Sequence, residues 1–323
     1  MARRDLVLGI DGGGTKTVCV ALDVKGHERG RGMAGSSNYH NVGLVAAQAA
    51  LKAAIEQALR AAGADKRDVR AICLGMSGVA RPRDRKRVSQ VLEAIGPFPK
   101  TLIFNDAIVA LTGGVGRCEG VVVISGTGCI AYGVNRQGEK ARASGWGPLL
   151  GDEGSGYAIG MAALRAATCA YDGSGPPTIL VERVLQFLGL GEMEDLVDWA
   201  YGQPFRWQRF ARLAVVVEQA ALEGDVVARG ILRRAGEALG RAANAVIRRL
   251  GMANEPFELV TVGGVFKTQL GLREALAETV HTVAPQAQLI FPRRGPAEGA
   301  ALLALEAVLG AKSCSATPLA LRG

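Results

Sequence analysis

The chain has 323 residues, of which 49% are hydrophobic and 21% charged, so it can bury a large core, and two domains are expected. The net charge is +8, and the densest basic run, Arg81–Arg87, contains no aromatic residue and belongs to no nucleic-acid motif. We interpret this run as a solvated face and expect no nucleic-acid partner.

Cysteine and histidine usage and the apolar runs bear on the cellular setting. The six cysteines form no CxxC pair and the three histidines do not cluster, which argues against a disulfide framework or a zinc site. No apolar run approaches the roughly 18 residues of a membrane span, and no signal-peptide pattern follows Met1. These features predict a soluble, cytoplasmic protein without a membrane partner.

The first third of the chain alternates between predicted strands and helices. In chain order we predict strands at 6–10 and 17–23, a helix at 44–62, a strand at 69–74, a helix at 83–95, a strand at 101–104 and a helix from Asp106. Strands that alternate with helices indicate mixed, mostly parallel sheets flanked by helices, the α/β class.

The same cycle begins again near the middle of the chain. We predict a strand and glycine turn at 121–128, a returning strand at 130–134, long amphipathic stretches at 206–222 and 225–250, strands at 259–262 and 288–291, and a closing helix at 296–309. The pattern indicates a duplicated α/β unit. We place the domains at 1–116 and 117–323, the second with a helical insertion, and expect the final helix to pack back on the first.

A glycine-rich segment, Asp11-Gly-Gly-Gly-Thr-Lys-Thr17, follows the first predicted strand. It is not a P-loop, because the lysine comes one residue late and a strand follows where a P-loop opens a helix. Glycines allow backbone N–H groups to approach a phosphate closely, with Thr15 and Lys16 adding a hydroxyl and a cation. The predicted phosphate-binding residues are Gly12, Gly13, Gly14, Thr15 and Lys16. The alternative is a hairpin that only turns the chain.

Two further glycine turns occur later. Ser125-Gly-Thr-Gly128 follows an apolar strand at the matching place of the second repeat, and Val262-Gly-Gly-Val-Phe266 joins a strand to a helix. Each is a weak signal alone. Together they favour a nucleotide-binding role, and the family resemblance that these turns carry implies ATP-binding groups at Gly126, Thr127, Gly128, Gly263, Gly264 and Lys267.

The three turns resemble, in order and spacing, the phosphate and adenosine motifs of the actin-like ATPases, a superfamily that includes sugar kinases. The segment Gly145-Trp-Gly-Pro-Leu-Leu-Gly-Asp-Glu-Gly-Ser-Gly156 resembles the signature of the N-acetylglucosamine kinases within the BadF/BadG/BcrA/BcrD ATPases. The resemblance extends from Leu6 to Ala304. It implies two duplicated actin-like, ribonuclease H-like domains with an ATP cleft between them.

The resemblance also implies roles for individual residues. Asp106 matches the aspartate that takes the proton from the attacking sugar hydroxyl, although it could instead cap its helix. Asp11 is expected to hold Mg²⁺ through water. The sugar-binding residues carried over are Asn38, Tyr39, Gly145, Trp146 and Asp152, together with Asp106. Tyr39 stands where the animal enzymes have a histidine, and Cys129 also departs from its motif, so the identity of the amino sugar stays open.

The sequence therefore predicts an ATP- and Mg²⁺-dependent amino-sugar kinase that phosphorylates the 6-hydroxyl of N-acetylglucosamine. Glucosamine and N-acetylmuramic acid are alternative substrates, and an activator ATPase for a partner reductase or dehydratase is an alternative function. No iron–sulfur cluster motif supports that last alternative. The resemblance implies a homodimer.

Overall fold

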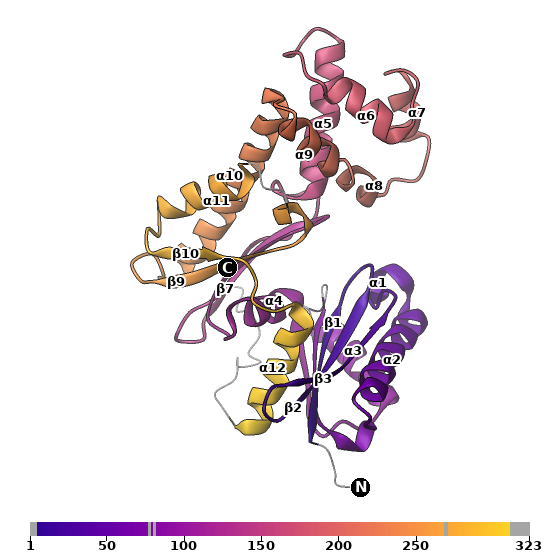
Figure 1. The fold of residues 1–323 in the computed structure, drawn as a ribbon, viewed down its shortest axis with the longest axis vertical. Coiled ribbons are helices and arrows are strands. Elements are labelled where there is room, and N and C mark those ends of the chain that lie inside the picture. Colours follow the sequence, from indigo (N-terminus) through magenta and orange to yellow (C-terminus); the bar gives the residue numbers. More distant parts are fainter. Residues whose placement is uncertain (1–4, 77–78, 80–81, 268–270, 311–323) are drawn as a thin grey trace. The chain divides into compact units, whose positions relative to one another are not determined.

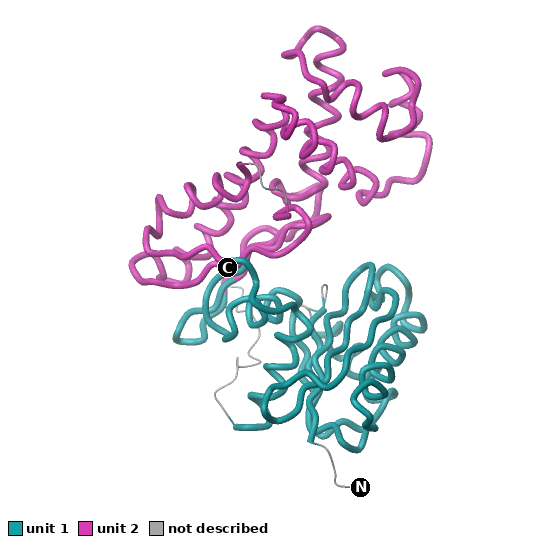
Figure 2. Tube along the Cα trace, viewed as in Figure 1, with its two compact units in different colours: residues 1–122, 133–140, 291–323 teal, residues 123–132, 141–290 magenta. Residues whose placement is uncertain are grey.

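The computed structural model describes residues 5–76, 79, 82–267 and 271–310. Arg81 and Cys314 lie outside these described residues. The chain divides into two compact units, shown in teal and magenta in Figure 2. Unit 1 comprises residues 1–122, 133–140 and 291–323, and unit 2 comprises residues 123–132 and 141–290.

The first sheet has the strand order β3-β2-β1-β4-β5. Its strands are β1 (Leu6–Gly12), β2 (Thr17–Asp23), β3 (Glu28–Ala34), β4 (Val69–Met76) and β5 (Thr101–Asn105). The β1/β2 and β2/β3 pairs are antiparallel, whereas β1/β4 and β4/β5 are parallel. The parallel pairs place the carboxyl ends of β1, β4 and β5 at one edge of the sheet.

Helices cover both faces of the first sheet, as Figure 1 shows for α2 and α12. The helices of unit 1 are α1 (Tyr39–Val42), α2 (Leu44–Ala61), α3 (Pro82–Ile95), α4 (Asp106–Val115) and α12 (Pro296–Leu309). Leu6, Leu8 and Ile10 share a buried core with residues of α2 and α3. On the other face Gly9 allows α12 to approach, since a Cβ there would lie 2.0 Å from the Ala301 nitrogen.

The second sheet repeats this arrangement with the order β8-β7-β6-β9-β10. Its strands are β6 (Gly120–Ser125), β7 (Cys129–Val134), β8 (Lys140–Ser144), β9 (Phe257–Val262) and β10 (Ala287–Ile290). Read in this direction, each strand has the sequence position of its counterpart in the first sheet. The predicted duplication is therefore confirmed, and both sheets are mixed.

Unit 2 is rich in helices. They are α5 (Gly156–Tyr171), α6 (Leu180–Leu188), α7 (Asp195–Tyr201), α8 (Trp207–Ala211), α9 (Ala214–Leu222), α10 (Val226–Arg249), α11 (Leu272–His281) and the 3₁₀ turn η2 (Gly264–Lys267). The amphipathic stretch expected at 206–222 is two helices, α8 and α9. In the described residues no helix has both the length and the apolar character needed to cross a membrane.

The sequence did not predict the third strand of either sheet, β3 or β8. In β3, the exposed Arg29 and Arg31 alternate with the buried glycines Gly30 and Gly32, and glycine lowers strand propensity. A Cβ on Gly30 or Gly32 would lie within 2.2 Å of a carbonyl oxygen of α2. The glycines are thus explained by the close packing of α2 on this strand.

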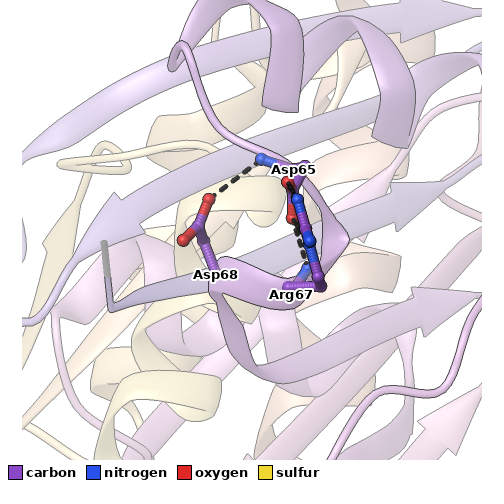
Figure 3. Close-up of polar contacts among 3 residues, drawn as sticks. All are labelled: Asp65, Arg67 and Asp68. Atoms are coloured by element: carbon purple, nitrogen blue, oxygen red, sulfur yellow. Dashed lines mark hydrogen bonds and ion pairs between the residues drawn. The ribbon is translucent and has the colours of Figure 1, made fainter. Parts of the chain in front are cut away.

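A capped 3₁₀ turn directly precedes β4. The 3₁₀ turn η1 (Lys66–Asp68) has a capping box in which the Asp65 N–H donates to Asp68 at 3.0 Å and the Arg67 N–H donates to Asp65 at 2.8 Å. The Arg67 guanidinium also pairs with Asp65 (Figure 3). This pair lies at the edge of the sheet opposite the carboxyl ends of the parallel strands.

Candidate active site

The first glycine turn is a hairpin between β1 and β2. The Gly13 N–H donates to the Lys16 carbonyl at 3.0 Å, which closes the turn. Thr15 and Lys16 are exposed at its tip. The strand–turn–strand interpretation is confirmed, and the hydroxyl and the ammonium group are both accessible.

Residues 35–38 lie beside this hairpin. Ser36 donates to the Gly13 carbonyl at 3.2 Å, and Thr17 donates to the Gly35 carbonyl at 2.7 Å. Asn38 caps α1, and its Oδ1 accepts from the His40 N–H at 3.1 Å. The predicted phosphate turn and the asparagine predicted to bind sugar therefore belong to neighbouring segments of unit 1.

Tyr39 belongs to the core of unit 1. The residue is only 8% exposed, and its hydroxyl donates to the buried carboxylate of Asp84 at 2.7 Å. Burial and this carboxylate raise the pKa of the Tyr39 hydroxyl. The sugar contact of Tyr39 stays a prediction, and the Tyr39 hydroxyl already donates a hydrogen bond to Asp84.

Two carboxylates follow the carboxyl ends of strands in the first sheet. Asp11 is the penultimate residue of β1, and Asp106 begins α4 directly after β5, with β4 between the two strands. The cap of α4 is Asn105, whose side chain accepts from the Ile108 N–H at 2.9 Å. Asp106 is therefore not the N-cap of α4, and its carboxylate is not needed to cap the helix.

Both carboxyl groups have raised pKa values. Burial raises the pKa of Asp106, opposed by backbone N–H groups at the start of α4. The pKa of Asp11 rises to about 6, chiefly through burial and then through the charges of Asp106 and Glu298, while Lys16 lowers it. These acids therefore act on one another electrostatically, which suits a site that receives a cation or a proton.

The second and third glycine turns lie together in unit 2. The second turn is bound to the start of α5, because the Gly156 N–H donates to the Gly126 carbonyl at 2.7 Å. Ser125 is buried and donates to the Gly154 carbonyl at 2.8 Å. Gly263 has φ of 118°, and a Cβ there would lie 2.0 Å from the Ser125 carbonyl oxygen. Only glycine fits this contact between the two turns.

Asp152 is a buried carboxylate beside the second turn. One oxygen accepts from the Gly145 N–H at 3.0 Å and from Ser144 at 3.3 Å. The other would lie 2.7 Å from a Cβ on Gly128. Ser144 and Asp152 have φ of 63° and 61°, and they are the non-glycine residues with positive φ in the described part of the chain. Strain of this kind concentrates at functional sites.

The loop that carries Trp146 exposes several large apolar side chains. Trp146 is 61% exposed, and Leu149 and Leu150 are each 80% exposed. The Arg142 guanidinium lies 4.6 Å from the centroid of the Trp146 ring, which is cation–π geometry. Trp146 is therefore an exposed residue and does not pack in a core.

Three remaining predicted residues lie at the surface of unit 2. Thr127 and Gly264 are exposed within their turns, and Lys267 is exposed at the end of η2. Glu153, to which no role was assigned, is also exposed and pairs with Arg241 at 3.4 Å. A surface ion pair of this kind contributes little to stability.

Sequence reasoning missed Glu298 and Asp84. Glu298 lies in the first turn of α12, raises the pKa of Asp11 and pairs with Arg31. It lies too far along the chain from Asp11 for any local pattern to connect them. Asp84 stands inside the basic run, and a single acid among five cations was the available signal.

The described residues were searched for metal sites and for reactive cysteines. No group of three or more His, Cys, Asp or Glu side chains that could hold a metal was found among them. Cys19, Cys73 and Cys129 are buried thiols, and burial raises the pKa of Cys129 to about 11. Cys118, by contrast, is disulfide-bonded, which the scattered cysteines did not predict.

The chain belongs to the BadF/BadG/BcrA/BcrD ATPase family, whose model matches residues 8–304. It is 43% identical over 313 residues to the N-acetyl-D-glucosamine kinase of Dictyostelium discoideum, covering 94% of this chain and 98% of the relative. It is 35% identical over 298 residues to an N-acetylmuramic acid/N-acetylglucosamine kinase of Clostridium acetobutylicum, covering 92% and 97% of the two chains.

Solved structures show the same fold. A provisionally assigned N-acetylglucosamine kinase from Chromobacterium violaceum matches with a TM-score of 0.75 and 29% identity, covering 94% of this chain and 99% of that one. A glucokinase of the ROK family from Streptomyces griseus matches with a TM-score of 0.59 at 19% identity, covering 93% and 98%. The actin-like sugar-kinase fold inferred from the motifs is confirmed.

Proposed function

We propose that this protein transfers the γ-phosphoryl group of ATP to the 6-hydroxyl of N-acetylglucosamine. The observation that carries the proposal is Asp106: a half-buried carboxylate with a raised pKa, at the same sheet edge as Asp11 and the first glycine turn. Family membership and the kinases named above support it. Phosphoryl transfer to an alcohol requires an oriented base and neutralisation of phosphate charge.

In unit 1, Asp106 accepts the proton of the sugar hydroxyl as that oxygen attacks phosphorus. A raised pKa suits this role, because a base is most effective when its pKa approaches the working pH. Asn38 donates to or accepts from sugar hydroxyls. Gly12, Gly13 and Gly14 present backbone N–H groups to phosphate, while Thr15 and Lys16 add a hydroxyl and a positive charge.

Magnesium fits the donors near the first turn. Mg²⁺ prefers oxygen ligands and keeps several waters, so one carboxylate such as Asp11 can hold it without an all-protein cage. When bound, the ion neutralises phosphate charge. The pKa of Asp11 is raised to about 6, chiefly by burial and then by the charge of Asp106, and a bound cation would offset that neighbouring charge.

In unit 2, we assign nucleotide contacts to Gly126, Thr127, Gly128, Gly263, Gly264 and Lys267. Gly145, Trp146 and Asp152 are assigned to the sugar. An indole face packs on a pyranose ring, and a carboxylate accepts from hydroxyl groups. The Asp152 carboxylate is already oriented by the Gly145 N–H, so little ordering is needed on binding.

We propose that the enzyme acts as a homodimer in the cytoplasm, with support from the family resemblance alone. Sedimentation of the purified chain tests the dimer, and fractionation of the native cells tests the location.

The decisive experiment is a coupled ADP-release assay with glucose, glucosamine, N-acetylglucosamine, N-acetylmannosamine and N-acetylmuramic acid, with and without Mg²⁺. We expect Mg²⁺-dependent turnover that is highest with N-acetylglucosamine. A kcat/KM at least tenfold higher for glucosamine would overturn the choice of sugar. ADP release that is independent of every sugar would overturn the kinase assignment and favour an activator ATPase.

A further inference from the structure

The loop that carries Trp146 has a residue with positive φ at each of its two ends. Ser144, the last residue of β8, has φ of 63°, and Asp152 has φ of 61°. Side chains other than glycine resist this conformation, so each position costs free energy that other contacts must offset. The backbone strain therefore lies at the start and at the end of one loop of unit 2, residues 144–152.

Hydrogen bonds join the two ends of this loop. Asp152 Oδ1 accepts from the Ser144 hydroxyl at 3.3 Å and from the Gly145 N–H at 3.0 Å. Within the loop, the Gly151 N–H donates to the Gly147 carbonyl at 3.0 Å. The loop is therefore closed by the side chains at its ends as well as by its own backbone.

The two oxygens of the Asp152 carboxylate differ in what they contact. Oδ1 accepts both hydrogen bonds from the loop, whereas Oδ2 accepts none from the described residues. Oδ2 faces the second glycine turn, where a Cβ on Gly128 would lie 2.7 Å from it. Asp152 is only 5% exposed, and a buried carboxylate oxygen without a donor is costly. A donor from outside the chain is therefore expected at Oδ2.

A buried thiol orients the Ser144 hydroxyl. The Sγ atom of Cys129, at the start of β7, lies 3.5 Å from Ser144 Oγ. Ser144 has one hydroxyl proton, which it donates to Asp152, so the thiol is the donor in its contact with Ser144. Burial raises the pKa of Cys129 to about 11, so the thiol keeps its proton at neutral pH. The donors thus run in one direction, from Cys129 to Ser144 to Asp152.

Folding alone would favour a glycine at position 144. Glycine adopts positive φ freely, and the Gly145 N–H would still join the two ends of the loop. What serine adds is a hydroxyl, and that hydroxyl contacts Asp152 on one side and Cys129 on the other. The Ser144 side chain therefore acts on the carboxylate that is assigned to the sugar.

We infer that Ser144, oriented by Cys129, is a positioning residue of the sugar site. It donates to one oxygen of Asp152, leaves the other oxygen for a substrate hydroxyl, and fixes the loop that presents Trp146. The inference rests on the proposed function, in which Asp152 and Trp146 contact the sugar. Because an acceptor that is already oriented loses little freedom on binding, removing this support should weaken sugar binding and spare ATP binding.

The test measures kcat, KM for N-acetylglucosamine and KM for ATP in Ser144→Ala, which keeps the Cβ and removes only the hydroxyl. We expect KM for the sugar to rise about tenfold, with kcat and KM for ATP within about threefold of the wild type. Ser144→Gly removes the hydroxyl and the strain together and should show the same rise. Ser174→Ala is the control, because it removes an exposed hydroxyl that donates to the Cys169 carbonyl, and it should change none of these values.

The thiol is tested by a pair of variants. Cys129→Ala removes the donor to Ser144 and should raise KM for the sugar about threefold, since a thiol is a weak donor. Cys129→Ser keeps a donor and should restore most of the wild-type value. Cys19→Ala removes a buried thiol of unit 1 and should leave KM for the sugar unchanged.

Hydrogen exchange reads the loop without turnover. The Gly145 N–H should exchange faster in Ser144→Ala than in the wild type, because the carboxylate that accepts from it is held less firmly. The same measurement in Ser174→Ala should match the wild type. If Ser144→Ala does not fold, Ser144→Gly takes its place in both measurements.

Two outcomes would overturn the inference while leaving a sugar kinase in place. They are an unchanged KM for the sugar in both Ser144 variants, and an equal rise in KM for sugar and ATP, which would indicate general disturbance of the fold. A Cys129→Ser variant as impaired as Cys129→Ala would overturn the part played by the thiol. Failure of the proposed function shows instead in the wild type, as ADP release that no sugar stimulates.

Discussion

The two glycine turns that join the first two strands of each sheet have the same place in the fold but different surroundings. The turn after β1 is open: Thr15 and Lys16 are exposed at its tip, and Asp11 lies at its base. The turn after β6 is packed against the start of α5 and against Gly263. The two turns therefore share a backbone arrangement. The turn in unit 1 carries exposed charged and polar side chains, whereas the turn in unit 2 is packed against other backbone segments.

Removing the proposed base should have the largest effect. Asp106→Asn keeps the shape of the site, so ATP and sugar should still bind while turnover falls by about two to four decades. Steady-state kinetics and calorimetric titration of each ligand measure the two effects separately. A variant that keeps more than about a tenth of wild-type turnover would show that Asp106 is not the base.

Next in size is a substitution at the packed turn. Gly263→Ala places a Cβ 2.0 Å from the Ser125 carbonyl oxygen at φ of 118°, so we expect a loss of about 3 kcal/mol or more in the free energy of unfolding. Gly126→Ala is the matched control, because a Cβ there meets no atom within 4 Å. It should keep stability but weaken ATP binding. Equal melting temperatures for the two variants would contradict the packing described for unit 2.

Substitutions in the open turn after β1 should lower ATP affinity and leave stability nearly unchanged. Lys16→Ala and Thr15→Val remove exposed side chains, so melting temperatures should hardly change, while ATP affinity falls by about 10- to 100-fold for the lysine and less for the threonine. Titration with ATP and with sugar separately decides the matter. If ATP affinity and turnover both stay at the wild-type level, the segment is only a turn.

The acids beside the open turn predict a pH dependence. The pKa of Asp11 in the folded chain, about 6, is above its ordinary value of 3.8, so ionisation opposes folding. Stability should therefore fall as pH rises from about 4 to about 6, by on the order of 1–3 kcal/mol, and stay lower above that range. Asp11→Asn should reduce this slope, and the raised pKa of Asp106 accounts for the part that remains. Urea unfolding without divalent cations measures it, and identical slopes for both proteins would argue against the assignment.

The smallest effect concerns the strained residue that contacts Asp152. Ser144 has φ of 63°, a conformation that glycine adopts freely and a β-branched residue resists. Ser144→Gly should change the free energy of unfolding by less than about 0.5 kcal/mol, whereas Ser144→Val should lower it by about 1–2 kcal/mol. Thermal unfolding of the pair tests this. Equal stabilities would mean that the backbone at 144 relaxes without strain.

The sequence alone predicted most of the elements and the three glycine turns, because their signals are local. Alternating apolar residues located β2, and α12 was predicted with the bounds that it has, 296–309. The glycines of β3 concealed a strand, since their reason is the approach of α2 from a distant part of the chain. Arg212 and Leu213, between α8 and α9, interrupt a stretch whose apolar spacing alone predicted one helix.

Residue chemistry was likewise determined by the sequence: three glycine turns, a carboxylate at the start of α4 and a basic run before Val88. Only the tertiary structure decided what each group is available to do. It gave the side-chain cap of α4 to Asn105 instead of Asp106, joined the Tyr39 hydroxyl to Asp84, and brought Glu298 near Asp11. Such pairings depend on side chains that packing brings together from distant segments, and no local pattern encodes them.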